Sequence, residues 1–229
     1  MPVQMSEKAY ELVRMTDSVA IGQRHTFADI QDLIACAKKY DFYLVYGLQC
    51  YNEYIVKELK GTNTKVGGAV GAASSFGEES LEEKIFAAKR WVEVGCDELD
   101  MFSNVSAIRS GKYDLVLKEM KAIREIAGDR ITKAIIHTPL LSPEEIKIAS
   151  QICVEAKIDF VKTSNGYYGP TTVEHVKIIK EAIGDKAQIK AAGGVAGLDM
   201  IAQLRAEGVT RLGLSYNKTL AYIEELNKQ

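Results

Sequence analysis

Three short apolar segments of the chain each carry a lysine, where a charged side chain is unusual. These lysines are Lys133, Lys162 and Lys190. Lysines are seldom fully buried without a partner, and burial or a nearby positive charge each disfavours the ammonium form. Lowering the pKa of a lysine from about 10.4 to about 7 raises its share of neutral amine roughly a thousandfold. Such an amine can attack a carbonyl and form a Schiff base, which acts as an electron sink.

A carboxylate stands in a similar apolar setting. The segment Glu98-Leu99-Asp100-Met101-Phe102 places Asp100 near its end. A carboxylate there could orient a lysine and a water molecule for proton transfer. It could equally balance a lysine at the rim of the fold or cap a helix, and each lysine could extend to the rim or pair with an acid. The residues alone leave both interpretations open.

Eight apolar segments of strand type run through the chain at regular intervals. They are Val13–Ala20, Asp41–Tyr46, Thr64–Val70, Asp97–Phe102, Ile131–His137, Ile158–Thr163, Gln188–Ala192 and Thr210–Leu214. Helical patterns separate them at 26–40, 79–94, Tyr113–Ala127, 142–156, Thr172–Ile183, Leu198–Glu207 and Lys218–Leu226. Strand–helix alternation predicts a parallel sheet, and eight repeats favour a closed barrel over an open sheet.

The length of the chain and its lack of linkers agree with this fold. The chain has 229 residues, and a (β/α)8 TIM barrel usually has about 250. We therefore predict an α/β protein with a single (β/α)8 barrel domain over residues 1–229. In such barrels the catalytic groups lie at the C-terminal ends of the strands.

Charge and composition exclude several classes of function. The net charge is −2, and no basic cluster suggests a nucleic-acid partner. No apolar run is long enough to span a membrane, and the N-terminus lacks the apolar core of a signal peptide. The four cysteines show neither C-x-x-C pairs nor metal-ligand spacing. We expect a cytoplasmic protein that binds no metal, contacts no membrane and needs no cofactor.

Several residues that follow the strands could contact a substrate. Gly193-Gly194 follows the seventh strand, and Gly213 to Asn217 follow the eighth. Barrel enzymes often bind phosphate at these turns through backbone N–H groups and a helix N-terminus. His137 ends the fifth strand, where it could contact the substrate.

Four stretches resemble the deoxyribose-phosphate aldolase family, most strongly between about residues 95 and 215. They are 159–166 (DFVKTSNG), 97–101 (DELDM), 110–114 (SGKYD) and 189–195 (IKAAGGV). The resemblance implies a class I aldolase that reversibly cleaves 2-deoxy-D-ribose 5-phosphate to acetaldehyde and D-glyceraldehyde 3-phosphate. Lys162 matches the Schiff-base lysine, Lys190 the lysine that lowers its pKa, and Asp100 the acid of the proton relay. Positions around the phosphate are matched by Gly166, Gly193, Gly194 and Ser215.

The surroundings of the substrate depart from the family pattern. Thr16-Asp17-Ser18 stands where members usually have Asp-His-Thr, and His137-Thr138 replaces Glu-Thr. A Phe-Pro turn after the third strand is replaced by 71–77, and Gly193-Gly194-Val195-Ala196 lacks the usual arginine. Tyr216-Asn217 stands where small residues are common. These departures keep other readings open: a relative acting on another aldehyde or sugar phosphate, a barrel that binds a sugar phosphate without turnover, or a sugar-phosphate isomerase. The resemblance also allows a homodimer.

Overall fold

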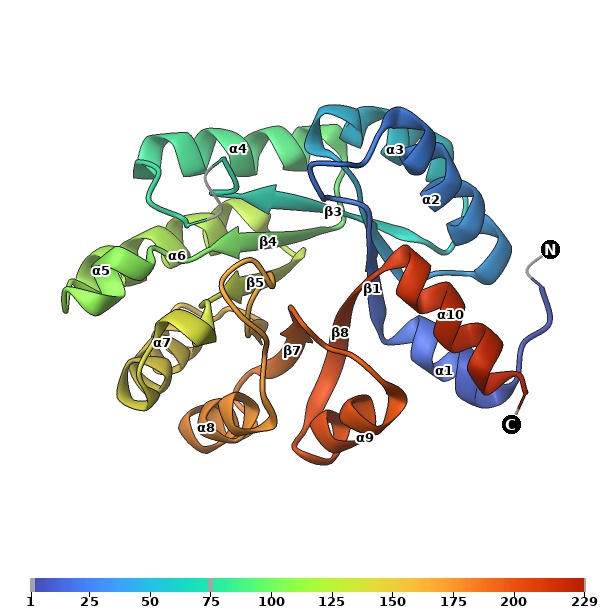
Figure 1. Cartoon of the computed structure of the whole chain (residues 1–229). Coiled ribbons are helices and arrows are strands. Elements are labelled where there is room, and N and C mark those ends of the chain that lie inside the picture. Colours follow the sequence, from blue (N-terminus) through green and yellow to red (C-terminus); the bar gives the residue numbers. More distant parts are fainter. Residues whose placement is uncertain (1–2, 74–75, 229) are drawn as a thin grey trace.

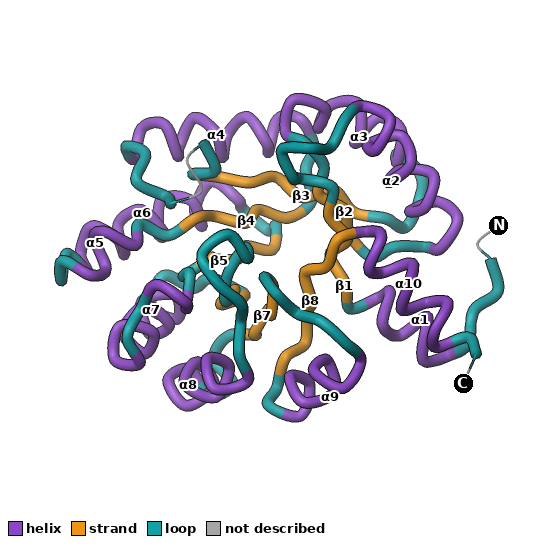
Figure 2. Tube along the Cα trace, in the orientation of Figure 1, coloured by secondary structure: helices purple, strands orange, loops and turns teal. Residues whose placement is uncertain are grey.

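The computed structural model describes residues 3–73 and 76–228 as a ring of strands surrounded by helices (Figures 1 and 2). All strand pairs are parallel, and β8 pairs with β1 to close the barrel. The strands are β1 (Thr16–Val19), β2 (Leu44–Tyr46), β3 (Lys65–Val70), β4 (Glu98–Phe102), β5 (Ile131–Ile135), β6 (Phe160–Lys162), β7 (Gln188–Ala192) and β8 (Val209–Ser215). The closed barrel confirms the predicted fold class.

Helices form the outer layer and cover the strands on all sides (Figure 2). They are α1 (Glu7–Arg14), α2 (Phe27–Tyr40), α3 (Asn52–Leu59), α4 (Leu81–Val94), α5 (Val105–Arg109), α6 (Tyr113–Ala127), α7 (Pro143–Glu155), α8 (Val173–Ile183), α9 (Leu198–Ala206) and α10 (Tyr216–Leu226). Two 3-10 turns, η1 (Gln49–Tyr51) and η2 (Thr138–Leu140), lie in loops. The two ends of the chain meet where α1 packs beside α10 (Figure 1).

Local capping residues explain where several helices begin. Ser142 caps α7 and accepts a hydrogen bond from the Glu145 N–H at 3.3 Å, and Pro143 occupies the first turn. Proline suits that position because its missing N–H would have no partner there. A capping box at Thr26 begins α2, with the Thr26 N–H donating to Asp29 at 2.6 Å.

Several strand boundaries differ from the sequence prediction for identifiable reasons. Asp41 is the left-handed C-cap of α2, so β2 begins only at Leu44. Val13 belongs to α1, which leaves β1 four residues long. His137 is also left-handed, with a φ of 56°, and the fifth strand ends two residues before it. Extended strand geometry cannot accommodate a positive φ.

The apolar core lies between the strands and the helices. Residues of α6 such as Val116, Met120 and Ile123 are fully buried on the face toward the barrel. Within the described ranges, no helix combines the length and the apolar character needed to cross a bilayer. The interior of the barrel is different, because charged side chains fill much of it.

A buried ion pair joins α4 to α6 outside the barrel. The Lys84 ammonium donates to Glu119 at 2.7 Å and to the Gly77 carbonyl at 2.5 Å, and both side chains are almost fully buried. Removing one partner of such a pair leaves an uncompensated buried charge. We expect Lys84→Met to lower the free energy of unfolding by about 3 kcal/mol, as measured by urea denaturation.

The double variant Lys84→Met/Glu119→Leu provides the control, because it removes both charges together. It should lose clearly less stability than Lys84→Met alone, since well-packed apolar residues often replace a buried pair at little cost. Equal losses in the single and double variants would contradict the role of this pair.

Candidate active site

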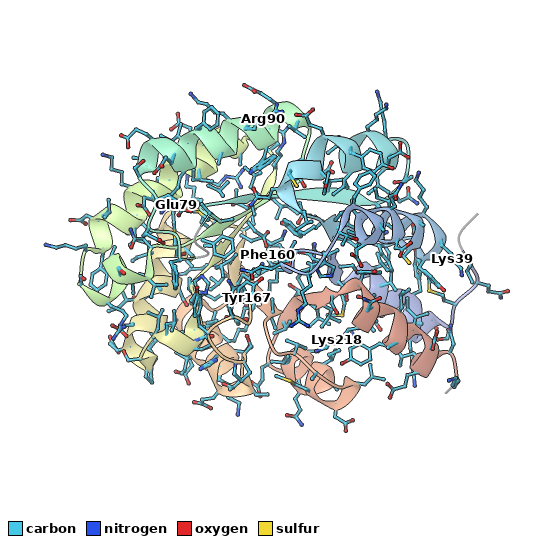
Figure 3. The ribbon with its side chains drawn as sticks, turned by 45° about the horizontal axis from the view of Figure 1, so that its top comes forward. Lys39, Glu79, Arg90, Phe160, Tyr167 and Lys218 are labelled. Carbon is cyan, nitrogen blue, oxygen red and sulfur yellow. The ribbon has the colours of Figure 1, made fainter. Side chains whose placement is uncertain are left out.

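Alternate residues of the strands point into the barrel and meet there, since strand side chains alternate between faces. Strand register brings Asp100 beside Lys133 and places Lys162 beside Lys190. In Figure 3, Phe160 and Tyr167 lie over the middle of the barrel, whereas Lys39 and Arg90 project outward from helices. The strands therefore position the charged groups that gather inside the barrel.

Asp100 is the hub of this cluster. Its Oδ2 accepts hydrogen bonds from the ammonium groups of Lys162 and Lys190, each at 2.8 Å. Its Oδ1 accepts from Lys133 at 2.8 Å and from the Tyr46 hydroxyl at 2.5 Å. Burial alone would raise the pKa of Asp100, but the three lysines hold it well below its usual range. Asp100 is therefore a carboxylate at neutral pH.

A second carboxylate, Asp17 of β1, extends the cluster toward β8. It accepts from Lys190 at 2.5 Å and from Arg211 at 2.9 Å. Glu98 adds a third carboxylate, 2.5 Å from the Lys133 ammonium. The pKa of Asp17 is lowered despite its burial, because Lys133, Lys190 and Arg211 surround it.

The charges inside the barrel balance when Lys162 is neutral. The acids are Asp17, Glu98 and Asp100, and the bases are Lys133, Lys162, Lys190 and Arg211. Three charges of each sign cancel, so a Lys162 ammonium is the fourth cation. Burial lowers the pKa of Lys162 to about 8, assisted by Lys190 and Lys133 and opposed by Asp100. At pH 7 about a tenth of Lys162 is then the neutral amine.

The Lys162 ammonium opens onto a cavity at the C-terminal end of the strands. The cavity has a volume of about 270 Å³, and its lining includes Lys162, Lys190, Asp100 and Tyr46. Apolar walls come from residues such as Val19 and Ile135. Lys162 is 13% exposed, whereas Lys190 is 1% exposed. Lys162 is therefore the lysine that a small carbonyl compound can reach.

The predicted rim glycines gather beside this cavity. Gly166 and Gly193 lie in the loops after β6 and β7, and their backbones touch: a Cβ on Gly193 would sit 2.5 Å from the Gly166 N. Both have positive φ values, and the neighbouring Gly194 packs in the same way against Pro170. Of these three glycines, Gly193 lines the cavity. The close approach of two loops thus explains why glycine stands at these positions.

Ser215 and His137 lie outside the cavity lining. Ser215 caps α10 and accepts a hydrogen bond from the Lys218 N–H at 3.3 Å. His137 is fully buried between Phe102 and Tyr168, whose ring centroids each lie 5.6 Å from its own. Neither ring nitrogen has a hydrogen-bond partner in the described part of the chain. Burial and the charge of Lys162 lower the pKa of His137 to about 4, so its ring is neutral at pH 7.

Sequence reasoning brought Lys162, Lys190 and Asp100 together but left out other members of the cluster. Asp17 was noted only as part of a departure from the family pattern, and Lys133 only as a lysine in a strand. Tyr46 and Arg211 were not selected. Marking every second residue of each strand as inward-facing would have found them, once the barrel was assumed to close.

The carboxylates of the cluster are paired with cationic side chains. Among the residues that the structure describes, no group of three or more His, Cys, Asp or Glu side chains could hold an ion. The arrangement suits amine chemistry: a partly neutral lysine, a carboxylate in contact with it and a small cavity for a carbonyl compound.

Comparison with known proteins agrees with this geometry. Residues 24–212 match the family model described as DeoC/LacD family aldolase. The chain is 36% identical to the deoxyribose-phosphate aldolase of Mycoplasma mobile over 94% of this chain and 98% of that protein. It is 39% identical to the Staphylococcus carnosus deoxyribose-phosphate aldolase, over 90% of this chain and 93% of that one.

A solved structure described as QR15, an aldolase, superposes with a TM-score of 0.87 and 30% identity, covering 95% of this chain and 96% of that one.

Fold and site together define a (β/α)8-barrel aldolase with a lysine amine at its centre. More specifically, the chain belongs to the DeoC/LacD aldolase family. The relationship reaches further toward the N-terminus than the sequence motifs alone indicated, since the relatives align over nearly the whole chain.

Proposed function

We propose that this protein reversibly cleaves 2-deoxy-D-ribose 5-phosphate to acetaldehyde and D-glyceraldehyde 3-phosphate through a Schiff base on Lys162. The observation that carries the proposal is the Lys162 amine, which reaches the cavity, touches Asp100 at 2.8 Å and has a pKa lowered to about 8. The two curated relatives described above bear the name of this activity.

Each step uses a group of the cluster. The neutral Lys162 amine adds to the aldehyde carbon of the open-chain sugar, and loss of water gives an iminium ion. A base removes the proton of the hydroxyl on the third carbon, and the bond between the second and third carbons breaks. Its electron pair moves to the iminium nitrogen, which releases glyceraldehyde 3-phosphate and leaves an enamine. Protonation of the enamine carbon and hydrolysis then free acetaldehyde and Lys162.

Asp100 and Lys190 take supporting roles in this proposal. Asp100 is the carboxylate that moves protons between Lys162, water and the substrate hydroxyl. Lys190 donates a hydrogen bond to the same oxygen of Asp100 as Lys162 does, and its positive charge disfavours the charged form of Lys162. We also assign His137 to the substrate, although it lies outside the cavity lining, because its neutral ring is close to Lys162 and has no hydrogen-bond partner among the described residues.

The phosphate would bind at the rim of the barrel rather than among the lysines of the interior. Gly166, Gly193 and Gly194 lie in the turns after β6 and β7, and Ser215 is the N-cap of α10, which follows β8. Lys218 adds a cation there, since its ammonium donates to the Val195 carbonyl at 3.2 Å. A helix N-terminus with a nearby cation is a suitable anion site.

Purified protein is expected to cleave 2-deoxyribose 5-phosphate, with glyceraldehyde 3-phosphate measured by a coupled dehydrogenase. Activity should survive dialysis against EDTA, because an amine nucleophile needs no Lewis acid. The alternative substrate class is an unphosphorylated aldehyde, which the apolar walls of the cavity would favour, or another sugar phosphate. A panel with and without phosphate decides between them, and inhibition by EDTA would argue against the amine mechanism.

Two further parts of the proposal concern the setting of the reaction. All four cysteines are free thiols, which suits the reducing cytoplasm.

We also propose a homodimer. Phe86 on α4 is 73% exposed and Leu115 on the neighbouring α6 is 43% exposed, which offers apolar surface for a second copy. Light scattering in solution measures the mass that decides this point.

A further inference from the structure

The Tyr46 side chain crosses the barrel interior from β2 to β4. Its hydroxyl donates to Asp100 Oδ1 at 2.5 Å, although β3 lies between the two strands. The phenol ring passes directly over Gly67 of β3, where an added Cβ would overlap the ring carbons and the hydroxyl. The absence of a side chain at Gly67 is therefore what allows Tyr46 to reach Asp100.

Tyr46 also touches the reactive end of the cluster. Its ring lines the same cavity as Lys162 and is 6% exposed. The ammonium nitrogens of Lys190, Lys133 and Lys162 lie 5.1, 5.5 and 5.9 Å from the ring centroid. Burial and the charges of Asp100, Asp17 and Glu98 raise the pKa of Tyr46 well above its usual value. The hydroxyl thus remains a protonated donor.

The two oxygens of Asp100 divide their partners in a way that gives Tyr46 a function. Oδ1 accepts from Tyr46 and Lys133, and Oδ2 accepts from Lys162 and Lys190. The Tyr46 bond fixes the rotation of the carboxylate and so keeps Oδ2 directed at Lys162. The same hydrogen bond also partly neutralises the negative charge of the Asp100 carboxylate, which would otherwise stabilise the Lys162 ammonium more strongly.

We propose that Tyr46 is a positioning residue: through Asp100 it holds Lys162 in a state that loses its proton readily, and Gly67 is the residue that makes room for it. This inference rests on the proposed function for its meaning in catalysis, since it explains how Lys162 is prepared to attack a carbonyl. It adds a phenol on β2 to a set that otherwise consists of lysines, an arginine and acids.

The other charged and titratable groups around Lys162 stay in place when the Tyr46 hydroxyl is removed. On β5 to β7 and the loop after β5 these groups are Lys133, Lys190 and His137, and from β1, β4 and β8 they are Asp17, Glu98, Asp100 and Arg211. Tyr46→Phe keeps the ring but removes the hydroxyl, which donates to Asp100 and accepts from the Lys133 ammonium at 3.2 Å. A change in the titration of Lys162 then reports on this hydroxyl and its two hydrogen bonds.

The test is competitive labelling of the whole protein with acetic anhydride across a pH series, with the Lys162 peptide quantified by mass spectrometry. In Tyr46→Phe the labelling midpoint of Lys162 should rise by about one unit, because a hydrogen bond to a charged group is lost. Labelling at pH 7 should fall about tenfold. An unchanged midpoint would overturn the inference.

Tyr43→Phe is the matched control. The Tyr43 hydroxyl donates to Glu98 at 3.1 Å, so this variant removes the same atom from a carboxylate that does not touch Lys162. It should leave the Lys162 midpoint unchanged, and an equal rise in both variants would assign the effect to general loosening and overturn the proposal. Gly67→Ala, which pushes the intact phenol away from Asp100, should reproduce the rise.

Labelling does not depend on turnover, so the two proposals fail separately. If the protein does not cleave 2-deoxyribose 5-phosphate but the Lys162 midpoint rises in Tyr46→Phe, the role of Tyr46 stands and the proposed substrate is refuted. If the protein cleaves the sugar phosphate but the Lys162 midpoint is the same in the native protein and in Tyr46→Phe, the proposed function stands and the role of Tyr46 is refuted.

Discussion

Lys162→Leu is expected to reduce cleavage of 2-deoxyribose 5-phosphate by a thousandfold or more, because removing a covalent nucleophile costs at least about that factor. No other lysine of the cluster can substitute for it. Lys190 lines the cavity but is only 1% exposed, Lys133 is fully buried, and each is held by two or more carboxylate partners. The measurement is kcat/KM at pH 8, near the lowered pKa of Lys162.

Trapping identifies the nucleophile independently of turnover. Treatment of the protein with acetaldehyde and borohydride should reduce the imine to an ethyl group on the Lys162 peptide, as detected by mass spectrometry. Lys147→Leu is a suitable control, since Lys147 lies on the outer face of α7 in an exposed pair with Glu181. It should leave both the rate and the adduct unchanged. An adduct on a different lysine would refute the central assignment.

Lys190→Leu is expected to move the acid limb of the pH–rate profile upward by one to two units. The Lys190 ammonium disfavours the charged form of Lys162 and also shares the Oδ2 atom of Asp100. Its removal frees Asp100 and Asp17 to stabilise the Lys162 ammonium, so the pKa of Lys162 rises from about 8. At pH 7 the rate should fall roughly 10- to 100-fold, which corresponds to that shift.

Charge balance provides the control for this variant. Lys190→Leu/Asp17→Asn removes one cation and the anion paired with it at 2.5 Å. In the double variant the pKa of Lys162 should fall part of the way back toward its native value. The acid limb of its pH–rate profile should therefore lie at a lower pH than that of Lys190→Leu. A pH profile in Lys190→Leu identical to that of the native protein would exclude Lys190 as the group that lowers the pKa.

The sequence predicted the repeating architecture because most strands and each long helix carry their own local signal. The strand β7 and the helix α6 have the predicted bounds. Short elements were missed: α5 has five residues, too few for an apolar stripe, and α3 has eight. The four residues of β1 include Thr16, Asp17 and Ser18, so hydropathy gave little sign of a strand.

The site was predictable to the extent that its members lie in recognisable motifs. Lys162, Lys190 and Asp100 each have one, whereas Asp17 and Arg211 come together only through the closure of β1 onto β8. These two residues are 194 positions apart, and nothing local marks them as partners. Tyr46 depends likewise on a glycine in the next strand. Contacts of this kind follow from the closed ring rather than from any single segment.

The balanced charges inside the barrel have a consequence for the response to salt. Mobile ions screen charges in water over about 8 Å at physiological ionic strength, but they act much less on buried pairs. The acidity of Lys162 is therefore insulated from the ionic composition of the medium. Lys218 and the start of α10 lie at the exposed rim, where screening operates fully. Added salt should thus weaken the capture of a charged substrate while leaving unchanged the pH at which the amine becomes reactive.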